Sequence, residues 1–271
     1  MSPVAPTTRV RWAVRDEGSG RPLLLLHGFT GTNAAWDEHA NDLASRFRVL
    51  VPCLPGHGGT VASAGAMSVE ATADELASLL RDRGATPAHV LGYSLGARVA
   101  LRLAVAHPGV VSRLVLERAS AGLPPAAERA ARRAADERLA ARLEADGIEA
   151  FVDDWERNPV FASQASLAPD RAARIRAMRL GNDPAGLAAS LRAAGQGAME
   201  PLFDRLGQVT APTLVIAGEL DTIGRPRAER VAAAIPGARL AIVRGAGHAP
   251  HDEAPDAFRA LVIPFLEETV E

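Results

Sequence analysis

Three side chains of the types used in nucleophilic or base catalysis occur in the chain order serine, aspartate, histidine. Ser94 is the centre of a G-x-S-x-G stretch, Asp221 follows a predicted strand, and His248 follows another strand and a glycine-rich turn. A serine hydroxyl becomes a strong base or nucleophile only when a neighbouring imidazole takes its proton. A carboxylate then holds the imidazole in the correct orientation. The order and the placement predict a catalytic triad of Ser94, Asp221 and His248.

Each member of the predicted triad also has a simpler interpretation. A lone G-x-S-x-G stretch often occurs by chance. Asp221 could form a turn or cap a helix, and Glu219 competes for the acid role. His248 could be a structural loop residue, and His251 competes with it. The occurrence of all three residues, in order and directly after strands, favours the catalytic interpretation.

The residues around Ser94 predict a sharp turn between a strand and a helix. Such a turn forces the serine to a positive φ, and Gly92 and Gly96 allow the strand and the helix to pass closely. The backbone amide of Leu95 then faces the site as one oxyanion donor. The amide of Phe29, in the loop after the predicted strand 23–26, is expected to be the second donor.

Strands and helices alternate in the pattern of a mostly parallel α/β sheet flanked by helices. The predicted strands are 9–14, 23–26, 48–51, 89–91, 111–116, 213–217 and 239–243. The predicted helices of this part are 33–46, 68–83, 95–106, 227–234 and 255–266. Between residues 120 and 205 the sequence has helical periodicity and almost no strand signal. We therefore expect a core domain formed by 1–119 and 206–271, with a helical cap inserted at 120–205.

Composition limits the class of protein. The net charge is −2, and all 30 basic residues are arginines, so the sequence predicts neither nucleic acid nor membrane partners. Cys53 is the single cysteine, and residues 1–9 lack the pattern of a signal peptide, which predicts a cytoplasmic protein. The remaining histidines lack metal-ligand spacing, so no metal is expected. The oligomeric state is left open.

The chain from residue 23 onwards resembles the α/β-hydrolase fold. It resembles more specifically the MenH family, the menaquinone-pathway 2-succinyl-6-hydroxy-2,4-cyclohexadiene-1-carboxylate synthases. This second resemblance lies in the elbow stretch 92–100 and in the cap, where sequences vary freely among unrelated α/β-hydrolases. The matching stretches beyond the elbow are 116–117, 121–123, 128–133, 151–155, 159–164, 186–192 and 195–197.

The resemblance implies a lyase that works without a cofactor. Its substrate would be 2-succinyl-5-enolpyruvyl-6-hydroxy-3-cyclohexene-1-carboxylate, a small anionic polycarboxylate from which the enzyme eliminates pyruvate. His248 would withdraw the proton of Ser94, and Ser94 would then remove an acidic ring proton beside a carbonyl group. The amides of Phe29 and Leu95 would stabilise the negative charge on the carbonyl oxygen, and Asp221 would orient the imidazole.

A tricarboxylate in a partly closed site needs several fixed cations. Arg98 lies one helical turn after Ser94, so its side chain is expected near the same opening. Arg132, with Arg133 as an alternative, and Arg179 match arginines that the resembled family uses to bind substrate carboxylates.

Two aromatic residues, Tyr93 and Trp155, would form a wall of the site and supply hydrogen-bond donors. The alternative for both is packing in a core. Glu156, beside Trp155, is expected to face away from an anionic substrate. The chain departs from the family at 222–224, where Thr-Ile-Gly stands in place of a Lys-Phe pair soon after the aspartate, and at Ala97, where many members have glycine.

Two rival functions use the same residues. A carboxylesterase or carbon–carbon bond hydrolase would form an acyl-enzyme on Ser94 and would have a mostly apolar cap. A non-catalytic receptor would bind a small ligand and would not need a nucleophile elbow. The arginines near the predicted site argue against the first rival, and the predicted triad argues against the second.

Overall fold

A seven-stranded sheet forms the centre of the molecule, in a computed structural model that describes residues 10–268. Its strand order is β2-β4-β3-β6-β7-β8-β9, and every neighbouring pair except β2 and β4 is parallel. A small two-stranded sheet pairs β1 with β5. The strands are β1 (Val10–Arg11), β2 (Val14–Glu17), β3 (Pro22–Leu26), β4 (Arg48–Pro52), β5 (Val61–Ala62), β6 (Ala88–Tyr93), β7 (Val111–Glu117), β8 (Thr213–Gly218) and β9 (Arg239–Val243).

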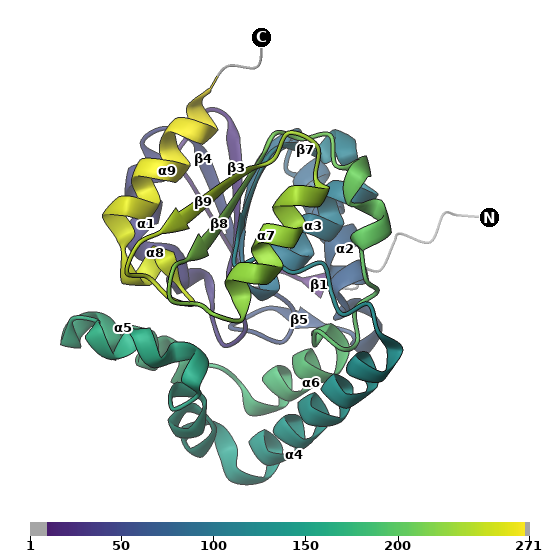
Figure 1. Cartoon of the computed structure of the whole chain (residues 1–271), viewed down its shortest axis with the longest axis vertical. Helices are drawn as coiled ribbons and strands as arrows, with labels where there is room; N and C mark the ends of the chain where they lie inside the picture. Colours follow the sequence, from purple (N-terminus) through teal and green to yellow (C-terminus); the bar gives the residue numbers. More distant parts are fainter. Residues whose placement is uncertain (1–9, 269–271) are drawn as a thin grey trace.

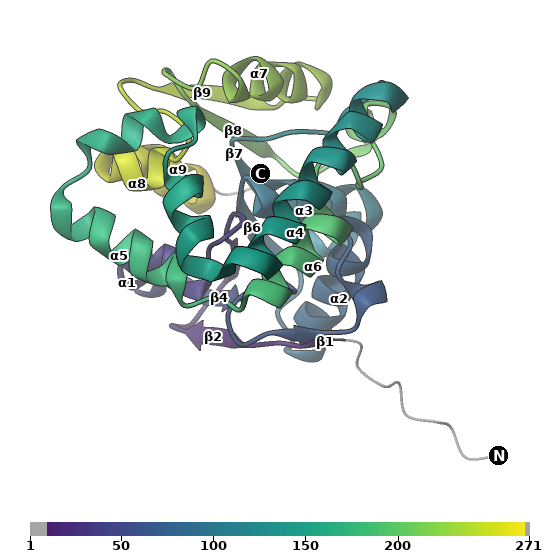
Figure 2. The same cartoon turned by 90° about the horizontal axis from the view of Figure 1, so that it is seen from below.

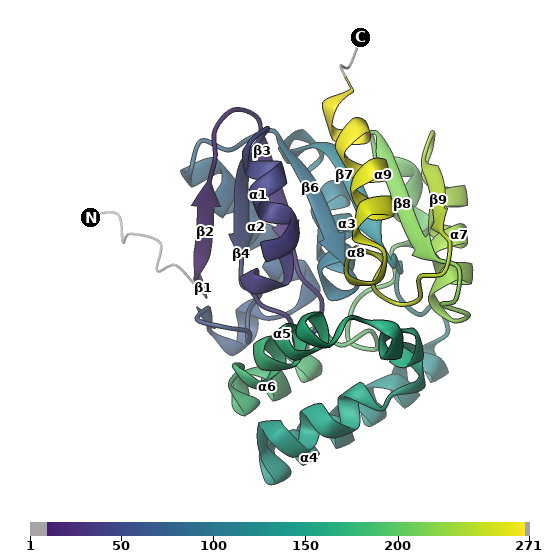
Figure 3. The same ribbon diagram turned by 90° about the vertical axis from the view of Figure 1, so that its left-hand side faces the viewer.

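Helices cover both faces of the sheet. In Figure 3, α1 and α9 lie on the near face, and α2, α3 and α7 lie behind the strands. The helices are α1 (Asp37–Ala44), α2 (Val69–Asp82), α3 (Leu95–Ala106), α4 (Ala126–Glu156), α5 (Pro169–Leu180), α6 (Pro184–Ala194), α7 (Gly224–Ala234), α8 (Pro250–Glu253) and α9 (Pro255–Glu267). The predicted α/β class and mostly parallel sheet are confirmed.

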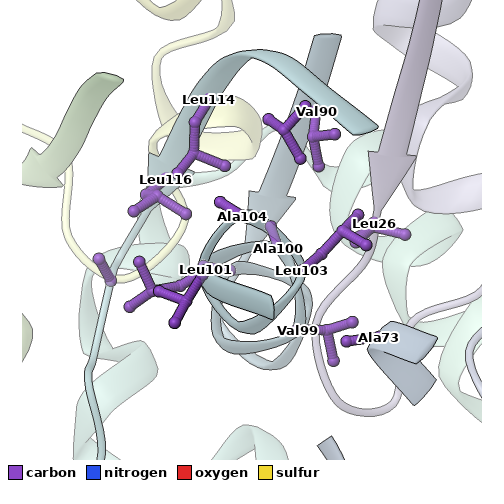
Figure 4. Packing of buried hydrophobic residues seen from close by; sticks show 14 of the residues in the cluster. Leu26, Ala73, Val90, Val99, Ala100, Leu101, Leu103, Ala104, Leu114 and Leu116 are labelled. Atoms are coloured by element: carbon purple, nitrogen blue, oxygen red, sulfur yellow. The ribbon is translucent and has the colours of Figure 1, made fainter. Parts of the chain in front are cut away.

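Successive side chains of each strand point to opposite faces of the sheet, and two separate cores therefore form. In β3, Leu24 and Leu26 pack with α2, α3 and α7, whereas Leu23 and Leu25 pack with residues of α1 and α9. All four leucines are fully buried. Figure 4 shows the first core around α3, where Leu101 and its neighbours fill the space beneath the strands. The serine turn at the start of α3 is therefore fixed from below by a densely packed helix.

Three predicted elements differ from the structure by more than a shift of one or two residues at an end. The first strand is divided into β1 and β2, which join different sheets, and its predicted first residue, Arg9, lies outside the described residues. The helix predicted at 33–46 begins instead with a 3-10 turn, Asn33–Trp36, capped by the Thr32 hydroxyl, and its α-helical part ends at Ala44. Helix α7 begins three residues early, because the Asp221 carboxylate accepts the amide of Gly224.

Helices α4, α5 and α6 lie across the carboxyl ends of the strands, between β7 and β8 in the chain (Figures 1 and 2). They share a small apolar core of their own that includes Leu143, Val152 and Leu187. Helix α4 is broken at Gly147, whose φ of 80° suits glycine. The two ends of this segment meet, since the amide of Leu202 donates to the carbonyl of Ala121 at 2.8 Å. The domain boundaries at 119/120 and 205/206 stay predictions.

No helix within residues 10–268 combines the length and the apolar composition needed to cross a membrane.

Candidate active site

Ser94 occupies the predicted turn between β6 and α3. Its φ of 51° lies in the region that side chains with a Cβ rarely adopt. The flanking glycines permit this turn: a Cβ on Gly92 would lie 2.3 Å from the carbonyl oxygen of Gly96, and a Cβ on Gly96 would lie 2.2 Å from that of Leu26. The serine is thus held in a strained backbone conformation above the carboxyl edge of the sheet.

Asp221 and His248 come together at the same edge, from the loops after β8 and β9. The imidazole Nδ1 of His248 lies 3.5 Å from Oδ2 of Asp221, and both side chains are buried. Burial opposes the charge of Asp221, but the His248 contact, the Arg118 guanidinium and the Gly224 amide outweigh it and lower the pKa of the carboxyl group. Burial lowers the pKa of His248, despite the opposite effect of Asp221. The pair therefore combines an ionised carboxylate with a neutral imidazole.

The two rivals for these roles have other partners. Glu219 accepts the amide of Gly245 and is exposed. His251 is buried and contacts Glu117, with Nδ1 of its ring 2.9 Å from the carboxylate. Both rival side chains are therefore hydrogen-bonded to groups other than Asp221 and His248.

The backbone of the loop after β3 approaches the serine turn closely. A Cβ on Gly28 would lie 3.5 Å from the Cβ of Ser94, and the amide of Gly96 donates to the carbonyl of His27. Within residues 10–268, the amides of Phe29 and Leu95 have no backbone or side-chain acceptor. Both residues line the cavity next to Ser94, which is the arrangement expected of oxyanion donors.

A cavity of about 490 Å³ lies between the sheet edge and helices α4–α6. Ser94 and His248 both line it, and the lining also contains the aromatic residues Tyr93 and Trp155. Five arginines contribute to the wall of this cavity: Arg98, Arg118, Arg132, Arg179 and Arg227. Such a concentration of guanidinium groups suits an anionic ligand with several carboxylates.

Arg98 and Arg132 lie in the part of the cavity wall that α3 and α4 form. Arg98 donates to a neutral acceptor, the carbonyl of Ala194, at 2.7 Å. Burial lowers the pKa of Arg98 to about 9, and the charge of Arg132 contributes further. Arg132 pairs with Asp136 at 2.8 Å, whereas the alternative residue, Arg133, donates to the carbonyl of Gly197 and does not line the cavity.

Arg179 reaches the cavity from α5 and is buried. Its Nη1 lies 2.9 Å from Glu156, and its Nη2 donates to Gln164 at 3.3 Å. Glu156 is outside the cavity wall, as expected, but its carboxylate also contacts Arg176. Three of the five cavity arginines, Arg118, Arg132 and Arg179, are therefore already partly neutralised by a carboxylate.

Tyr93 and Trp155 combine wall and packing roles. The ring of Tyr93 lies 4.5 Å from that of His251 and 5.7 Å from that of His248, measured between centroids. Trp155 stacks on Phe151 at 5.6 Å and contacts Phe29 at 5.4 Å. These contacts join the cap to the loop that carries the Phe29 amide.

In the described part of the chain, no group of three or more histidine, cysteine, aspartate or glutamate side chains has the geometry to hold a metal ion.

Comparison with known proteins identifies the family of this chain. A model of the alpha/beta hydrolase family matches residues 23–261. A Bacillus subtilis (strain 168) protein, provisionally named 2-succinyl-6-hydroxy-2,4-cyclohexadiene-1-carboxylate synthase, is 38% identical over 95% of this chain and 95% of its own length. The protein of that name from Escherichia coli O1:K1 / APEC is 33% identical over 86% of this chain and 88% of its own. The solved structure of MenH from S. aureus matches with a TM-score of 0.89 and 32% identity, over 96% of this chain and 98% of that chain.

The chain belongs to the α/β-hydrolase family, and within it to the MenH family. The resemblance in the elbow and cap sequences is thereby confirmed.

Two cavity arginines of this MenH-family chain are absent from the sequence prediction. Arg118 follows β7 directly, and Arg227 lies in the first turns of α7. The order of the strands contains a signal for the first: β7 lies between the strands that carry Ser94 and Asp221, so the residue after it must lie near both. No comparable signal identifies Arg227, because its direction depends on where α7 begins.

Proposed function

We propose that this MenH-family enzyme is a carbon–oxygen lyase that eliminates pyruvate from 2-succinyl-5-enolpyruvyl-6-hydroxy-3-cyclohexene-1-carboxylate. The observation that carries the proposal is the cavity in which Ser94 and His248 lie beside five arginines. The family relationship supports the same activity, since relatives over most of the chain are named synthases of the corresponding product.

The reaction begins with proton transfer at Ser94. Neutral His248 takes the hydroxyl proton, and the serine oxygen removes the ring proton next to the succinyl carbonyl group. The released electron pair forms a new ring double bond, and the existing double bond shifts. The carbon–oxygen bond to the enolpyruvyl group then breaks, and enolpyruvate takes up a proton and becomes pyruvate.

The fixed groups of the cavity stabilise the charge that develops. Negative charge on the succinyl oxygen is met by the amides of Phe29 and Leu95, which need no rearrangement because the elbow and the β3 loop fix them. Asp221 holds the imidazole and stabilises its protonated form. Arg98, Arg132 and Arg179 bind carboxylates of the substrate, and Tyr93 and Trp155 enclose its ring.

The arginine-lined wall favours this lyase over an acyl-enzyme hydrolase. A simple ester gains little from five guanidinium groups, whereas a tricarboxylate needs them for desolvation of its charges. A reducing cytoplasmic location is part of the proposal, supported by the single cysteine, Cys53, which is buried as a free thiol.

The test is release of pyruvate from the enolpyruvyl substrate, followed by lactate dehydrogenase and NADH. Ser94→Ala should lower kcat about 100- to 10,000-fold, the range for loss of a positioned base. Ser166→Ala, an exposed serine of the cap outside the cavity wall, is the matched control. Efficient turnover of p-nitrophenyl acetate without release of pyruvate would contradict the proposal.

A further inference from the structure

Arg118 stands at a backbone position that favours glycine. Its φ is 56°, in the left-handed region, where a side chain with a Cβ costs about 1–2 kcal/mol. The position directly follows β7, between the strands that carry Ser94 and Asp221. Glycine would adopt this φ without strain. The presence of an arginine here therefore indicates that its side chain has a role in the cavity.

One edge of the Arg118 guanidinium group is hydrogen-bonded within the protein, and the other is open. Its Nε donates to Oδ2 of Asp221 at 3.0 Å, while the residue lines the cavity. Within residues 10–268, its Nη1 and Nη2 have no protein acceptor. Gly224 supplies the space for this arrangement, since a Cβ there would lie 2.7 Å from Nε of Arg118 and 2.0 Å from Oδ2 of Asp221.

Arg227 lines the same cavity from α7. Its Nη1 donates at 3.2 Å to the neutral amide oxygen of Gln196, and no carboxylate pairs with it in the described part of the chain. Burial lowers the pKa of Arg227, and the charges of Arg118 and Arg132 lower it further. The two guanidinium groups thus repel each other, and the carboxylates of Asp221 and Glu128 offset this effect on Arg227 only in part.

We infer that Arg118 and Arg227 form an additional subsite for a carboxylate of the substrate, at the α7 end of the cavity. The inference rests on the proposed function, because it assigns one carboxylate of the same substrate. An anion between them would relieve the repulsion and use the open Nη edge of Arg118. Since the other edge of Arg118 holds Asp221, an occupied subsite also contacts the triad through a single side chain.

The experiment compares Arg118→Gln, Arg227→Gln and the double variant with the wild-type protein. The readouts are KM and kcat for pyruvate release and, independently of turnover, the Kd for tricarballylate from calorimetry. We expect Arg227→Gln to raise KM and the Kd for tricarballylate at least about tenfold with little change in kcat. Arg118→Gln should raise KM and Kd similarly and also lower kcat, because it is a positioning residue for Asp221. The double variant should lose less than the product of the single effects, since both arginines contact one carboxylate.

Arg225→Gln is the matched control. Arg225 lies two residues from Arg227 on α7, pairs with Glu229 and does not line the cavity, so its KM and Kd should equal those of the wild-type protein. A wild-type protein that releases pyruvate while both cavity variants keep KM and Kd within about twofold would overturn this subsite and leave the proposed function intact. A wild-type protein that releases no pyruvate would overturn the proposed function, and the subsite with it.

Discussion

The carboxylate of Glu117 accepts both the backbone amide and the ring Nδ1 of His251, each at 2.9 Å. Glu117 ends β7 and is fully buried, and His251 lies three residues after His248. This contact attaches the loop that carries His248 to the middle of the sheet. Burial opposes the charge on His251, but the carboxylates of Asp252 and Glu117 raise its pKa to about 9.

Replacing Glu117 by Gln should destabilise the protein by up to about 3–5 kcal/mol near pH 6.5, because the buried charge of His251 is left with the more distant Asp252 carboxylate, at 3.4 Å. The pH dependence should also change. A histidine with a raised pKa stabilises the folded state fully below its unfolded value of 6.5, and this contribution is lost as the pH rises through about 9. Thermal unfolding from pH 6 to 9.5 measures this slope, which should be smaller in Glu117→Gln.

Asp74→Asn provides the control for that variant. Asp74 pairs with His107 on the surface, where its side chain is 65% exposed. Its loss should have an effect near zero at any pH. Equal pH slopes in wild type and Glu117→Gln would contradict the assignment of charge to His251.

The acidic limb of the kcat/KM profile should lie below pH 6.5. The active form of His248 is the neutral imidazole, and burial lowers its pKa, so this form persists to lower pH than in a free histidine. The Arg118 charge contributes to the same lowering, so Arg118→Gln should move the limb to higher pH. Pyruvate release measured between pH 4 and 8 checks both shifts. A limb above 6.5 in the wild-type protein would exclude His248 as the base.

Arg98→Ala should lower kcat/KM for the enolpyruvyl substrate about 10- to 150-fold. This factor corresponds to a loss of about 1.5–3 kcal/mol in transition-state binding, the range for a hydrogen bond to a charged group. Arg102→Ala is the control, because Arg102 lies one turn further along α3 and pairs with Glu200. Steady-state kinetics of the two variants distinguish a cavity cation from an arginine outside it. Equal values would remove Arg98 from the substrate site.

Glu156→Gln should lower KM. The Glu156 carboxylate neutralises part of the Arg179 charge, and its side chain is 28% exposed, so the pair contributes about 0.2–1 kcal/mol. Without this pair, the full charge of Arg179 is available to the substrate, and KM should fall by up to about fivefold. Asp153→Asn removes only the neighbouring contact to Arg176 and should leave KM unchanged. A higher KM in Glu156→Gln would mean that the glutamate holds Arg179 in its binding position.

Asn182→Ala should destabilise the contact between cap and core. The Nδ2 group of Asn182 donates to the carbonyl of Thr30 at 2.9 Å, and its Oδ1 accepts the amide of Gly58 at 3.0 Å. The side chain is buried, so its loss leaves backbone groups unpaired at about 1–3 kcal/mol. Denaturant unfolding measures the loss, and Asn41→Ala, on the exposed side of α1, should be nearly neutral.

The sequence is sufficient to predict that Ser94, Asp221 and His248 lie at one edge of the sheet, because each follows a strand, and their catalytic roles stay part of the proposal. Chain order and apolar runs determine the sheet, and the sheet places the ends of β6, β8 and β9 at one edge. The sharp turn at Ser94 can be predicted in the same way from the glycines around it, since their close contacts leave no space for a Cβ.

The arginines were predicted less completely, because their direction depends on packing and helix starts. Arg98 could be predicted from its spacing to Ser94, and Arg132 and Arg179 from family resemblance. Arg227 was missed, because the prediction started α7 at residue 227, whereas the helix begins at Gly224, whose amide donates to the Asp221 carboxylate. The pairing of Glu156 with Arg179 joins two cap segments, and spacing alone does not predict such a contact.

The hydrogen bond between Leu202 and Ala121 joins the two chain ends of the cap, which favours replacement of the cap as a unit. Because the two chain ends of the insertion are adjacent at that point, a roof from another protein could be grafted there without displacing the strands beneath it. In such a chimera Ser94, Asp221 and His248 would stay in place, and the choice of substrate would depend on the new cap together with the core arginines Arg98, Arg118 and Arg227.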